Sequence, residues 1–147
     1  MPIEPYSVPR IGIGVMIFKD GKILLSKRKG AHGEGQYAFP GGHLELNETF
    51  LECAKRETRE ECGLEITNVR FQFVVNSVHY APRHFVHIGL IADWESGEPQ
   101  ILEPDKSESW VWYAPEEAPR PLFVYCEMAI DQLKYPRACI DADGRDL

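Results

Sequence analysis

The distribution of apolar residues at the start of the chain predicts a β-hairpin. Residues 11–18 (IGIGVMIF) form a largely apolar run, and a second apolar run, KILLS, follows at 22–26. Between them, Asp20-Gly21 is a two-residue turn signal of the kind that joins antiparallel strands. A polar, glycine-rich segment occupies 29–36, and we expect regular structure to stop at Pro40-Gly41-Gly42.

The pattern next predicts a helix over residues 49–62. Asn47 or Glu48-Thr49 can open it, because short polar side chains at a helix start accept hydrogen bonds from the first free N–H groups. Acidic residues lie near this end, where the helix dipole favours negative charge. Gly63 supplies the usual C-terminal stop, since glycine adopts the left-handed conformation without strain.

The remaining chain predicts three more strands and a second helix. We expect strands at 69–79, 84–93 and 109–113, an acidic loop at 94–107, and a helix at about 123–134. The resulting order, β-β-α-β-β-β-α, fits an α/β protein. Its expected architecture is an α/β/α sandwich with a mixed β-sheet between helices.

Length and composition indicate a single domain over residues 1–147. With 147 residues, 44% apolar and 11% aromatic, the chain can bury a core of ordinary size, and no repeat or linker marks a second domain. We expect the core at about 10–135 and a loosely ordered tail at 136–147. Because there is no run of about 18 apolar residues and no apolar signal core at the start, we expect a cytoplasmic protein without a membrane segment.

Charge and cysteine spacing argue against two further classes of protein. A net charge of −7 without a basic stripe would repel a nucleic-acid backbone, so stable nucleic-acid binding is not expected. The four cysteines show neither a CxxC pair nor a matched histidine spacing, which argues against zinc and favours reduced, partly buried thiols. A small anionic substrate fits this charge, because it would arrive bound to a divalent cation.

Three glutamates on the predicted helix form a pattern typical of a metal site. Glu57, Glu60 and Glu61 stand at i, i+3 and i+4, so their carboxylates share one face within an arc of about 100°. Like charges this close repel one another unless a cation lies between them. Carboxylate oxygens are hard ligands that suit Mg²⁺ or Mn²⁺. We therefore expect Mg²⁺ as the cofactor, with Mn²⁺ as the alternative.

Residues around these glutamates extend the pattern. Arg56 lies four residues before Glu60 and can brace the carboxylates, while Glu48 can neutralise Arg56 or add a ligand. The preceding Gly41-Gly42 frees backbone N–H groups and lets the chain approach a phosphate closely. Loop and helix together are predicted to form a cradle for phosphate and metal.

The same segment resembles the signature of the Nudix hydrolase superfamily. From Gly42 to Leu64 the chain matches G-x5-E-x7-R-E-U-x-E-E-x-G-U, where U is bulky and aliphatic, at every charged and glycine position. One departure is Thr58 at the first U position, which weakens the packing of the helix on the sheet rather than the chemistry. Similarity to MutT-like nucleoside triphosphate diphosphatases extends over about residues 10–125, in the runs SKRKG, FPGGHLE, VVNS and EPDKSESWVW.

This resemblance implies a Nudix-type fold and a hydrolytic enzyme. The implied reaction is Mg²⁺-dependent hydrolysis of a phosphoanhydride bond in a nucleoside triphosphate, standard or modified, to a nucleoside monophosphate and pyrophosphate. Two alternatives stay open: a diphosphatase acting on another diphosphate, such as an isoprenyl diphosphate, and a binding or regulatory module without turnover. Family members of this size are often homodimers, so a homodimer is also among the expectations.

The resemblance further implies roles for the acidic residues. Glu57, Glu60 and Glu61 would hold the metal ions, and Arg56, supported by Glu48, would orient them. Such enzymes also use a carboxylate from the loop before the aromatic strand, as a metal ligand or as a base. Asp105 fits this position best by its distance from Trp110, with two close rivals, Glu103 and Glu108. The expected catalytic residues are thus Arg56, Glu60, Glu61 and Asp105.

A second set of residues is expected to contact the substrate. These residues are Arg28, Phe39, Gly41, Gly42 and His43. Arg28 follows the second strand and matches a family arginine that contacts the phosphates, a task that suits its planar guanidinium. Phe39, Leu122 and Phe123 can wall a base pocket, but such residues near strand and helix starts are more often core. Core is the favoured interpretation for these three, with Phe39 as the main exception.

Overall fold

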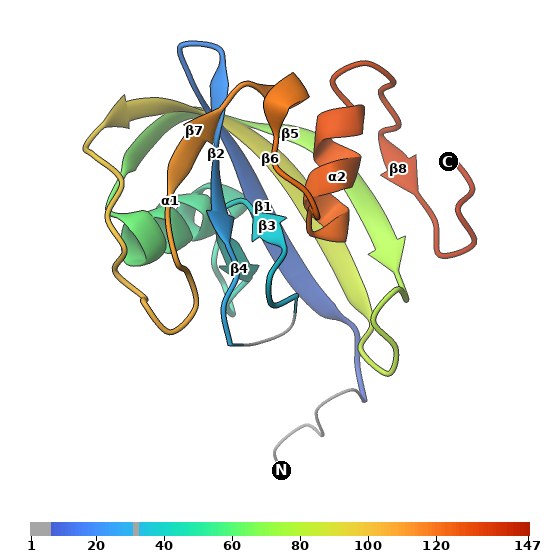
Figure 1. Cartoon of the computed structure of the whole chain (residues 1–147). Coiled ribbons are helices and arrows are strands. Elements are labelled where there is room, and N and C mark those ends of the chain that lie inside the picture. Colours follow the sequence, from blue (N-terminus) through green and yellow to red (C-terminus); the bar gives the residue numbers. More distant parts are fainter. Residues whose placement is uncertain (1–6, 31–32) are drawn as a thin grey trace.

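The computed structural model describes residues 7–30 and 33–147 (Figure 1). Its elements, in chain order, are β1 (Arg10–Lys19), β2 (Lys22–Lys27), β3 (Tyr37–Ala38), β4 (Gly41–His43), α1 (Phe50–Cys62), β5 (Glu65–Ser77), β6 (Phe85–Ser96), β7 (Val111–Tyr113), the 3-10 helix η1 (Pro115–Glu117), α2 (Val124–Asp131) and β8 (Cys139–Ile140). The predicted hairpin, both helices and the three later strands are confirmed, with boundaries shifted by a few residues. No helix in the described ranges is long and apolar enough to cross a membrane.

The β1–β2 hairpin closes through a turn in which both residues are left-handed. Asp20 has a φ of 51° and Gly21 a φ of 77°, which is the backbone that a tight two-residue hairpin turn requires. The two strands pair antiparallel, with Lys19 opposite Lys22. Directly after β2, the backbone N–H of Arg28 donates to the carbonyl of Gln36. The end of β2 and this hydrogen bond together fix the backbone position of Arg28.

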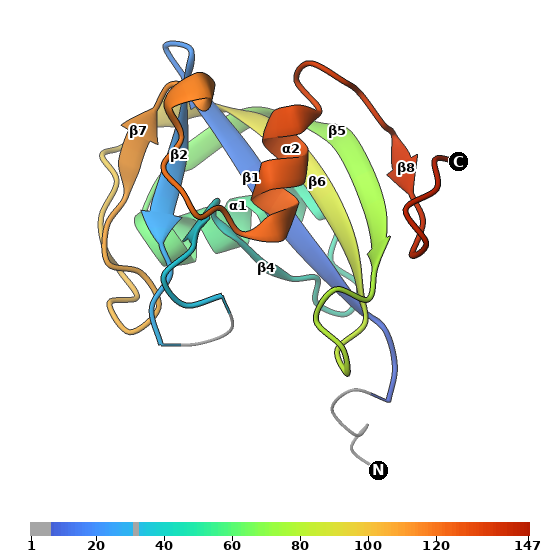
Figure 2. The ribbon, with the colours of Figure 1, turned by 45° about the vertical axis from the view of Figure 1, so that its right-hand side comes forward.

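The strands within the described residues form one mixed sheet. Its order is β3-β2-β1-β6-β5-β8, with β4 beside β1 and β7 beside β2. Strands β1 and β6 run parallel, whereas β5 and β6 are antiparallel. Figures 1 and 2 show α1 behind this sheet and α2 in front of it. The predicted α/β/α sandwich with a mixed sheet is confirmed.

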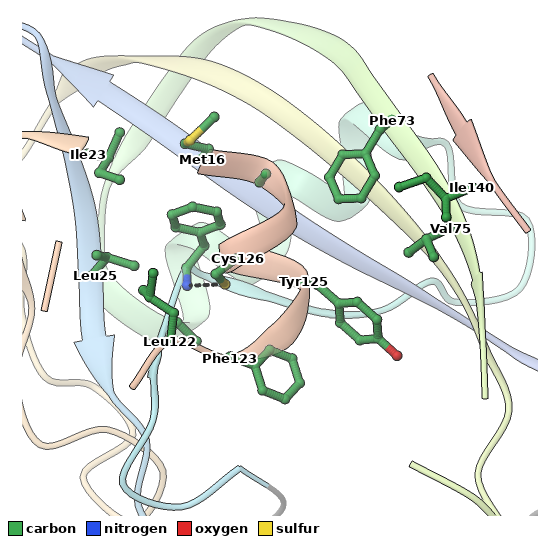
Figure 3. Packing of buried hydrophobic residues seen from close by; sticks show 13 residues of the cluster. Met16, Ile23, Leu25, Phe73, Val75, Leu122, Phe123, Tyr125, Cys126 and Ile140 are labelled. Carbon is green, nitrogen blue, oxygen red and sulfur yellow. Dashed lines mark hydrogen bonds between the residues drawn. The ribbon is translucent and has the colours of Figure 1, made fainter. Parts of the chain in front are cut away.

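Side-chain alternation along β1 divides the core between the two faces of the sheet. Ile13, Val15 and Ile17 belong to a buried cluster on the α1 side, which also contains Cys53, Ala54 and Cys62. Met16 belongs to the opposite cluster, on the α2 side, together with Phe73, Val75, Tyr125, Cys126 and Ala129 (Figure 3). Burial of apolar surface on both faces, worth roughly 25 cal/mol per Å², holds the three layers together.

Helix α1 begins and ends with the signals expected from the sequence. The Thr49 side chain accepts a hydrogen bond from the Glu52 N–H, and the Glu52 carboxylate accepts one from the Thr49 N–H. This reciprocal capping box satisfies two N–H groups that the helix itself leaves free. At the other end, Gly63 adopts a φ of 74°, and its N–H donates to the carbonyls of Thr58 and Arg59.

The structure departs from expectation at Gly41-Gly42. Regular structure was expected to stop there, but Gly41–His43 forms β4, which pairs antiparallel with residues 12–14 of β1. The prediction is wrong because the missing side chain allows close pairing here instead of breaking the strand. A Cβ on Gly41 would lie 2.2 Å from the carbonyl oxygen of Ile13. Glycine is therefore what permits this contact.

The tail at 136–147, expected to be loosely ordered, is tied to the sheet. Cys139 and Ile140 pair with Val74 and Val75 of β5, and Ile140 is only 5% exposed. The Arg137 side chain also donates to the Asp146 carboxylate. A strand of two residues leaves almost no pattern in the sequence, because its pairing depends on the free edge that β5 offers.

Candidate active site

A cleft of about 480 Å³ lies between the glycine-rich parts of β1 and β4, the side of α1 and the start of α2. Its size suits a small molecule. Its walls combine carboxylates of α1, Glu57 and Glu61, with three cationic side chains, Arg28, Lys29 and Lys106. The remaining wall is largely aromatic and contains Phe39, Phe85, His87, Trp110, Phe123 and Tyr125.

The two glycines of β4 let the strand lie directly against the carboxylates of α1. The Gly41 N–H donates to Glu61 Oε2 at 2.9 Å. A Cβ on Gly42 would come within 2.3 Å of Glu57 Oε1, so any side chain at this position would displace that carboxylate. Gly41 and Gly42, expected to contact phosphate, therefore also fix the positions of Glu57 and Glu61.

Arg56 connects the acidic residues of this region. Its guanidinium donates to both Glu48 oxygens, from Nε at 2.6 Å and from Nη2 at 2.9 Å. Nη1 donates to Glu57 Oε1 at 2.7 Å and to Glu60 Oε2 at 3.3 Å, while Nη2 also donates to the His43 carbonyl at 3.2 Å. A planar donor set of this kind holds several carboxylates in fixed orientations.

The pKa values divide these carboxylates into two groups. Hydrogen bonds from Arg56 lower the pKa of Glu48 to about 2. In contrast, desolvation in the cleft raises the pKa of Glu61 to about 8, and the charges of Glu57 and Glu103 add to this rise. Desolvation also raises the pKa of Glu57, although Arg56 opposes it. The anion is thus stabilised at Glu48, whereas the anionic forms of Glu57 and Glu61 are not fully compensated by the protein.

A divalent cation would compensate the negative charge of ionised Glu57 and Glu61. Glu57, Glu61 and the neighbouring Glu103 supply oxygen atoms, which Mg²⁺ and Mn²⁺ prefer as ligands. Across 7–30 and 33–147, however, no three acidic, histidine or cysteine side chains converge closely enough to hold a metal ion as they stand. Glu60 lies apart, since its side chain is 52% exposed, pairs with Arg56 and does not line the cleft. It would have to rotate to join Glu57 and Glu61.

A cationic rim faces these carboxylates across the cleft. The Arg28 guanidinium lies over the Phe123 ring, with Cζ 4.7 Å from the ring centroid, and its charge acts on Glu61 by lowering the pKa of that carboxyl. Lys29 joins Lys106 through a hydrogen bond from the Lys29 N–H to the Lys106 carbonyl. Three positive side chains on one rim can receive an anionic substrate despite the negative net charge of the chain.

Of the three loop carboxylates, Glu103 is the one whose charge raises the pKa values of both Glu57 and Glu61. Asp105 lies in the turn 104–106 and is exposed, and neither Asp105 nor Glu103 lines the cleft. Glu108 is also exposed and pairs with Lys27 at 3.9 Å. Asp105 stays the residue that the resemblance predicts, while the electrostatics favour Glu103, a difference that distance along the chain could not reveal.

The remaining expected contacts lie on the rim and in the core. His43 is exposed at the mouth of the cleft and stacks on Phe85, with ring centroids 5.9 Å apart. Leu122 and Phe123 belong to the buried cluster on the α2 side, which confirms the core interpretation. Phe39 belongs to it too, and its N–H donates to Cys126 Sγ at 3.3 Å, drawn as a dashed line in Figure 3. Phe39 and Phe123 nevertheless also reach the cleft.

Several cleft residues were not expected from the sequence. His87, Trp110 and Tyr125 line the cleft, but their local patterns indicate only a strand residue, a strand start and a helix residue. The available signal was the pair Gly12 and Gly14, since glycine inside a strand marks a place where another group approaches closely. Here that group is the His87 ring, which the pairing of β1 with β6 brings against Gly12 and Gly14.

The model of the NUDIX domain family matches residues 8–127 of the chain. This match covers most of the sequence, and the chain therefore belongs to the NUDIX domain family, the family of Nudix hydrolases. The predicted family is thus confirmed.

Individual relatives agree with this assignment. A crystal structure of a MutT NUDIX hydrolase from Burkholderia pseudomallei is 35% identical, with a TM-score of 0.82, over 87% of this chain and 100% of that one. An NAD-capped RNA hydrolase NudC from Vibrio vulnificus is 33% identical over 71% of this chain, and an ADP-ribose pyrophosphatase from Methanocaldococcus jannaschii is 39% identical over 63%. The chain spans 38% and 56% of the lengths of these two curated relatives, respectively.

Proposed function

We propose that this chain hydrolyses the phosphoanhydride bond between the α and β phosphorus atoms of a nucleoside triphosphate, with Mg²⁺ as the cation. Water is added across the bond, so one phosphorus gains a hydroxyl oxygen, the bridging oxygen leaves with the other, and the products are a nucleoside monophosphate and pyrophosphate. The observation that carries this proposal is a single cleft that combines buried carboxylates, a cationic rim and an aromatic wall.

Each part of the cleft has a task in this reaction. Glu57 and Glu61 would hold the cation, whose chemistry is to lower the pKa of a water molecule and to compensate charge on phosphate oxygens. Arg56 keeps the Glu57 carboxylate oriented through its hydrogen bond. Arg28 would donate hydrogen bonds to phosphate oxygens. Glu103, whose charge acts on both Glu57 and Glu61, would accept a proton from the attacking water.

A nucleoside diphosphate joined to another group is the second candidate substrate. Two of the relatives are named as an NAD-capped RNA hydrolase and an ADP-ribose pyrophosphatase, and the bond split in such molecules is the same phosphoanhydride. The acidic and cationic parts of the cleft would serve both substrate classes. The two candidates differ in what lies beyond the second phosphate.

Product analysis tests the proposed function. The purified chain is incubated with Mg²⁺ and, separately, with the common nucleoside triphosphates, ADP-ribose, NAD and isopentenyl diphosphate, and the products are separated by ion-exchange chromatography. We expect pyrophosphate and a monophosphate from at least one triphosphate, and loss of product when the cation is chelated. If no triphosphate is cleaved, the proposal fails.

Substitution of Glu61 tests whether the activity belongs to this cleft. Glu61→Gln should lower kcat by at least about 10²-fold, because a neutral amide cannot hold the cation in the same way. The matched control is Glu116→Gln, an exposed glutamate of η1 outside the cleft, which should keep kcat within about threefold. Unchanged activity in the Glu61 variant would assign the hydrolysis to another site or to a contaminant.

The single domain over 1–147, the homodimer and the cytoplasmic location stay predictions of the sequence. Exposed apolar side chains near the start of α1, including Leu46 at 92% and Phe50 at 46% exposure, are compatible with an interface between two copies. Stable nucleic-acid binding remains unexpected for a chain of net charge −7.

A further inference from the structure

His87 lies on β6 at the aromatic end of the cleft. Its main chain pairs with Gly12 of the parallel strand β1, and its side chain lines the cleft although the residue is only 8% exposed. The glycines of β1 make room for the ring, since a Cβ on Gly14 would lie 3.0 Å from His87 Cε1 and 3.1 Å from Nε2. The imidazole therefore occupies space that side chains of β1 would otherwise fill.

Aromatic packing fixes the orientation of this imidazole. It stacks on Tyr125 with ring centroids 4.2 Å apart and an interplanar angle of 15°, and Phe73 lies 6.0 Å away. Tyr125 is itself anchored, because its hydroxyl donates to Ser77 Oγ at 2.9 Å. The ring of His87 thus belongs to a preformed site.

Among residues 7–30 and 33–147, histidine side-chain hydrogen bonds are made by His79 and His84 and not by His87. An imidazole that lines a cleft without a hydrogen bond to the protein can pair with a ligand instead. Desolvation lowers the pKa of His87 to about 3, which leaves a neutral ring with one donor and one acceptor nitrogen. Trp110, another residue of the cleft lining, has a buried Nε1 without a partner in the described chain.

We propose that His87 hydrogen-bonds the polar edge of a heteroaromatic base and thereby selects nucleotides over isoprenyl diphosphates. This inference rests on the proposed function and adds the substrate class that the aromatic end of the cleft recognises. Phe39, Phe123 and Tyr125 contribute apolar ring atoms to this end of the cleft, while His87 addresses the edge of the base. The phosphates of the same nucleotide would then lie at the end of the cleft that contains Glu57, Glu61 and Arg28.

A hydrocarbon chain does not fit this end of the cleft as well. It offers no hydrogen bond to the polar atoms of His87 and Trp110, and polar groups left unpaired by a ligand weaken its binding. A base presents both donors and acceptors on its edge, so it can satisfy the imidazole in either tautomer. The polar atoms therefore favour a base over an isoprenoid.

Kinetics of His87 variants test the selection. His87→Phe keeps a ring that can stack on Tyr125 but removes both nitrogens, and it should raise KM for the best nucleoside triphosphate about tenfold while kcat changes less than about threefold. His87→Gln restores one donor and one acceptor and should return KM to within about threefold of the native value. As a matched control, His84→Gln alters a histidine that bonds Asn76 outside the cleft and should leave KM unchanged.

A measurement on the unaltered protein avoids any loss of folding in the variants. The imidazole ¹⁵N signals are followed by NMR, with the His87 signal assigned by its absence in His87→Gln. Addition of the nucleoside monophosphate product should shift this signal, whereas ribose 5-phosphate, which carries the same phosphate and sugar without the base, should not. Equal shifts with both ligands, or none with either, would overturn the role of His87.

The experiments distinguish a failure of the proposed function from a failure of the inference about His87. A native protein that cleaves no nucleoside triphosphate contradicts the proposed function itself. A native protein that cleaves one, but whose His87 signal and KM values do not depend on the base, contradicts only the inference about His87. A water molecule that merely pairs with the imidazole would produce this second result.

Discussion

At the scale of single residues, the carboxylates near Arg56 differ in how well the protein stabilises their negative charge. Glu48 receives two hydrogen bonds from the guanidinium and keeps a pKa of about 2. Glu61 receives one from the Gly41 N–H, which does not compensate for its desolvation beside Glu57 and Glu103. The anionic form of Glu61 therefore lacks a partner, which is the physical reason for expecting a divalent cation there.

The loop carboxylates provide a residue-scale prediction. Glu103→Gln should lower kcat at least about tenfold, because the charge of Glu103 is felt by both Glu57 and Glu61. Asp105→Asn and Glu108→Gln are matched controls from the same loop, exposed and outside the cleft, and should stay within about threefold of native kcat. Steady-state rates with the best triphosphate decide between them, and a large loss in Asp105→Asn alone would favour Asp105 as the loop carboxylate.

At the scale of elements, one side of helix α1 packs into the core and the other faces the cleft. Cys53, Ala54 and Cys62 pack into the core cluster of their sheet face, while Glu57 and Glu61 face β4 and the cleft. Thr58 lies on the buried side, fully inaccessible, and its hydroxyl donates to the Ala54 carbonyl at 2.7 Å. The departure from the Nudix signature at this position is thus accommodated inside the helix.

Replacement of Thr58 gives a prediction about this element. Thr58→Val should raise the free energy of unfolding by about 1 kcal/mol and Tm by about 2–4 °C, because a buried methyl replaces a hydroxyl whose partner already accepts a regular helix hydrogen bond. Thr67→Val on β5, where threonine is exposed, is the matched control and should change stability by less than about 0.5 kcal/mol. Urea titration measures both, and a destabilised Thr58 variant would mean that the hydroxyl contributes more than the methyl.

At the scale of the whole molecule, the site exists because segments distant in sequence meet in one sheet. Strand β6 pairs with β1 over nine residue pairs, from Arg10↔Phe85 to Phe18↔Asp93, and this register sets His87 against the glycines of β1. Helix α2 then closes the opposite side with Tyr125. His87 is therefore both a buried residue of the fold and part of the cleft wall.

The burial of this imidazole makes the stability of the fold depend on pH. The pKa of His87 is lowered to about 3 in the folded chain by burial, against about 6.5 when unfolded. As pH falls below 6.5, the unfolded state binds a proton that the folded state does not, so this contribution to stability is present above pH 6.5 and is lost progressively down to about pH 3. The titratable side chain packed on the ring is Tyr125, whose own pKa is raised by burial.

Denaturant titrations at pH 7 and pH 5 measure this dependence. Between these values the native protein should lose about 2 kcal/mol more stability than His87→Gln, following from about 1.4 kcal/mol per pH unit below 6.5. His84→Gln, which removes a histidine outside the cleft, should keep the native pH dependence. Equal pH dependence in the native protein and His87→Gln would show that the buried imidazole does not remain neutral.

Much of the fold was predictable because its signals are local. The turn at Asp20-Gly21, the capping box at Thr49 and the stop at Gly63 each act within a few residues of chain. β4 and β8 were not predictable, since strands of two or three residues form only where an existing edge accepts them. The position of Glu103 relative to Asp105 depends likewise on how the loop folds back over α1.

The sequence by itself determined the family and the acidic helix, because helix geometry converts the spacing of Glu57, Glu60 and Glu61 into a shared face. Only the tertiary structure decided which of these carboxylates faces the cleft and that His87 and Tyr125 form the aromatic end. Each of these depends on strand register and loop path, which are set by packing between distant segments and not by neighbours in the chain.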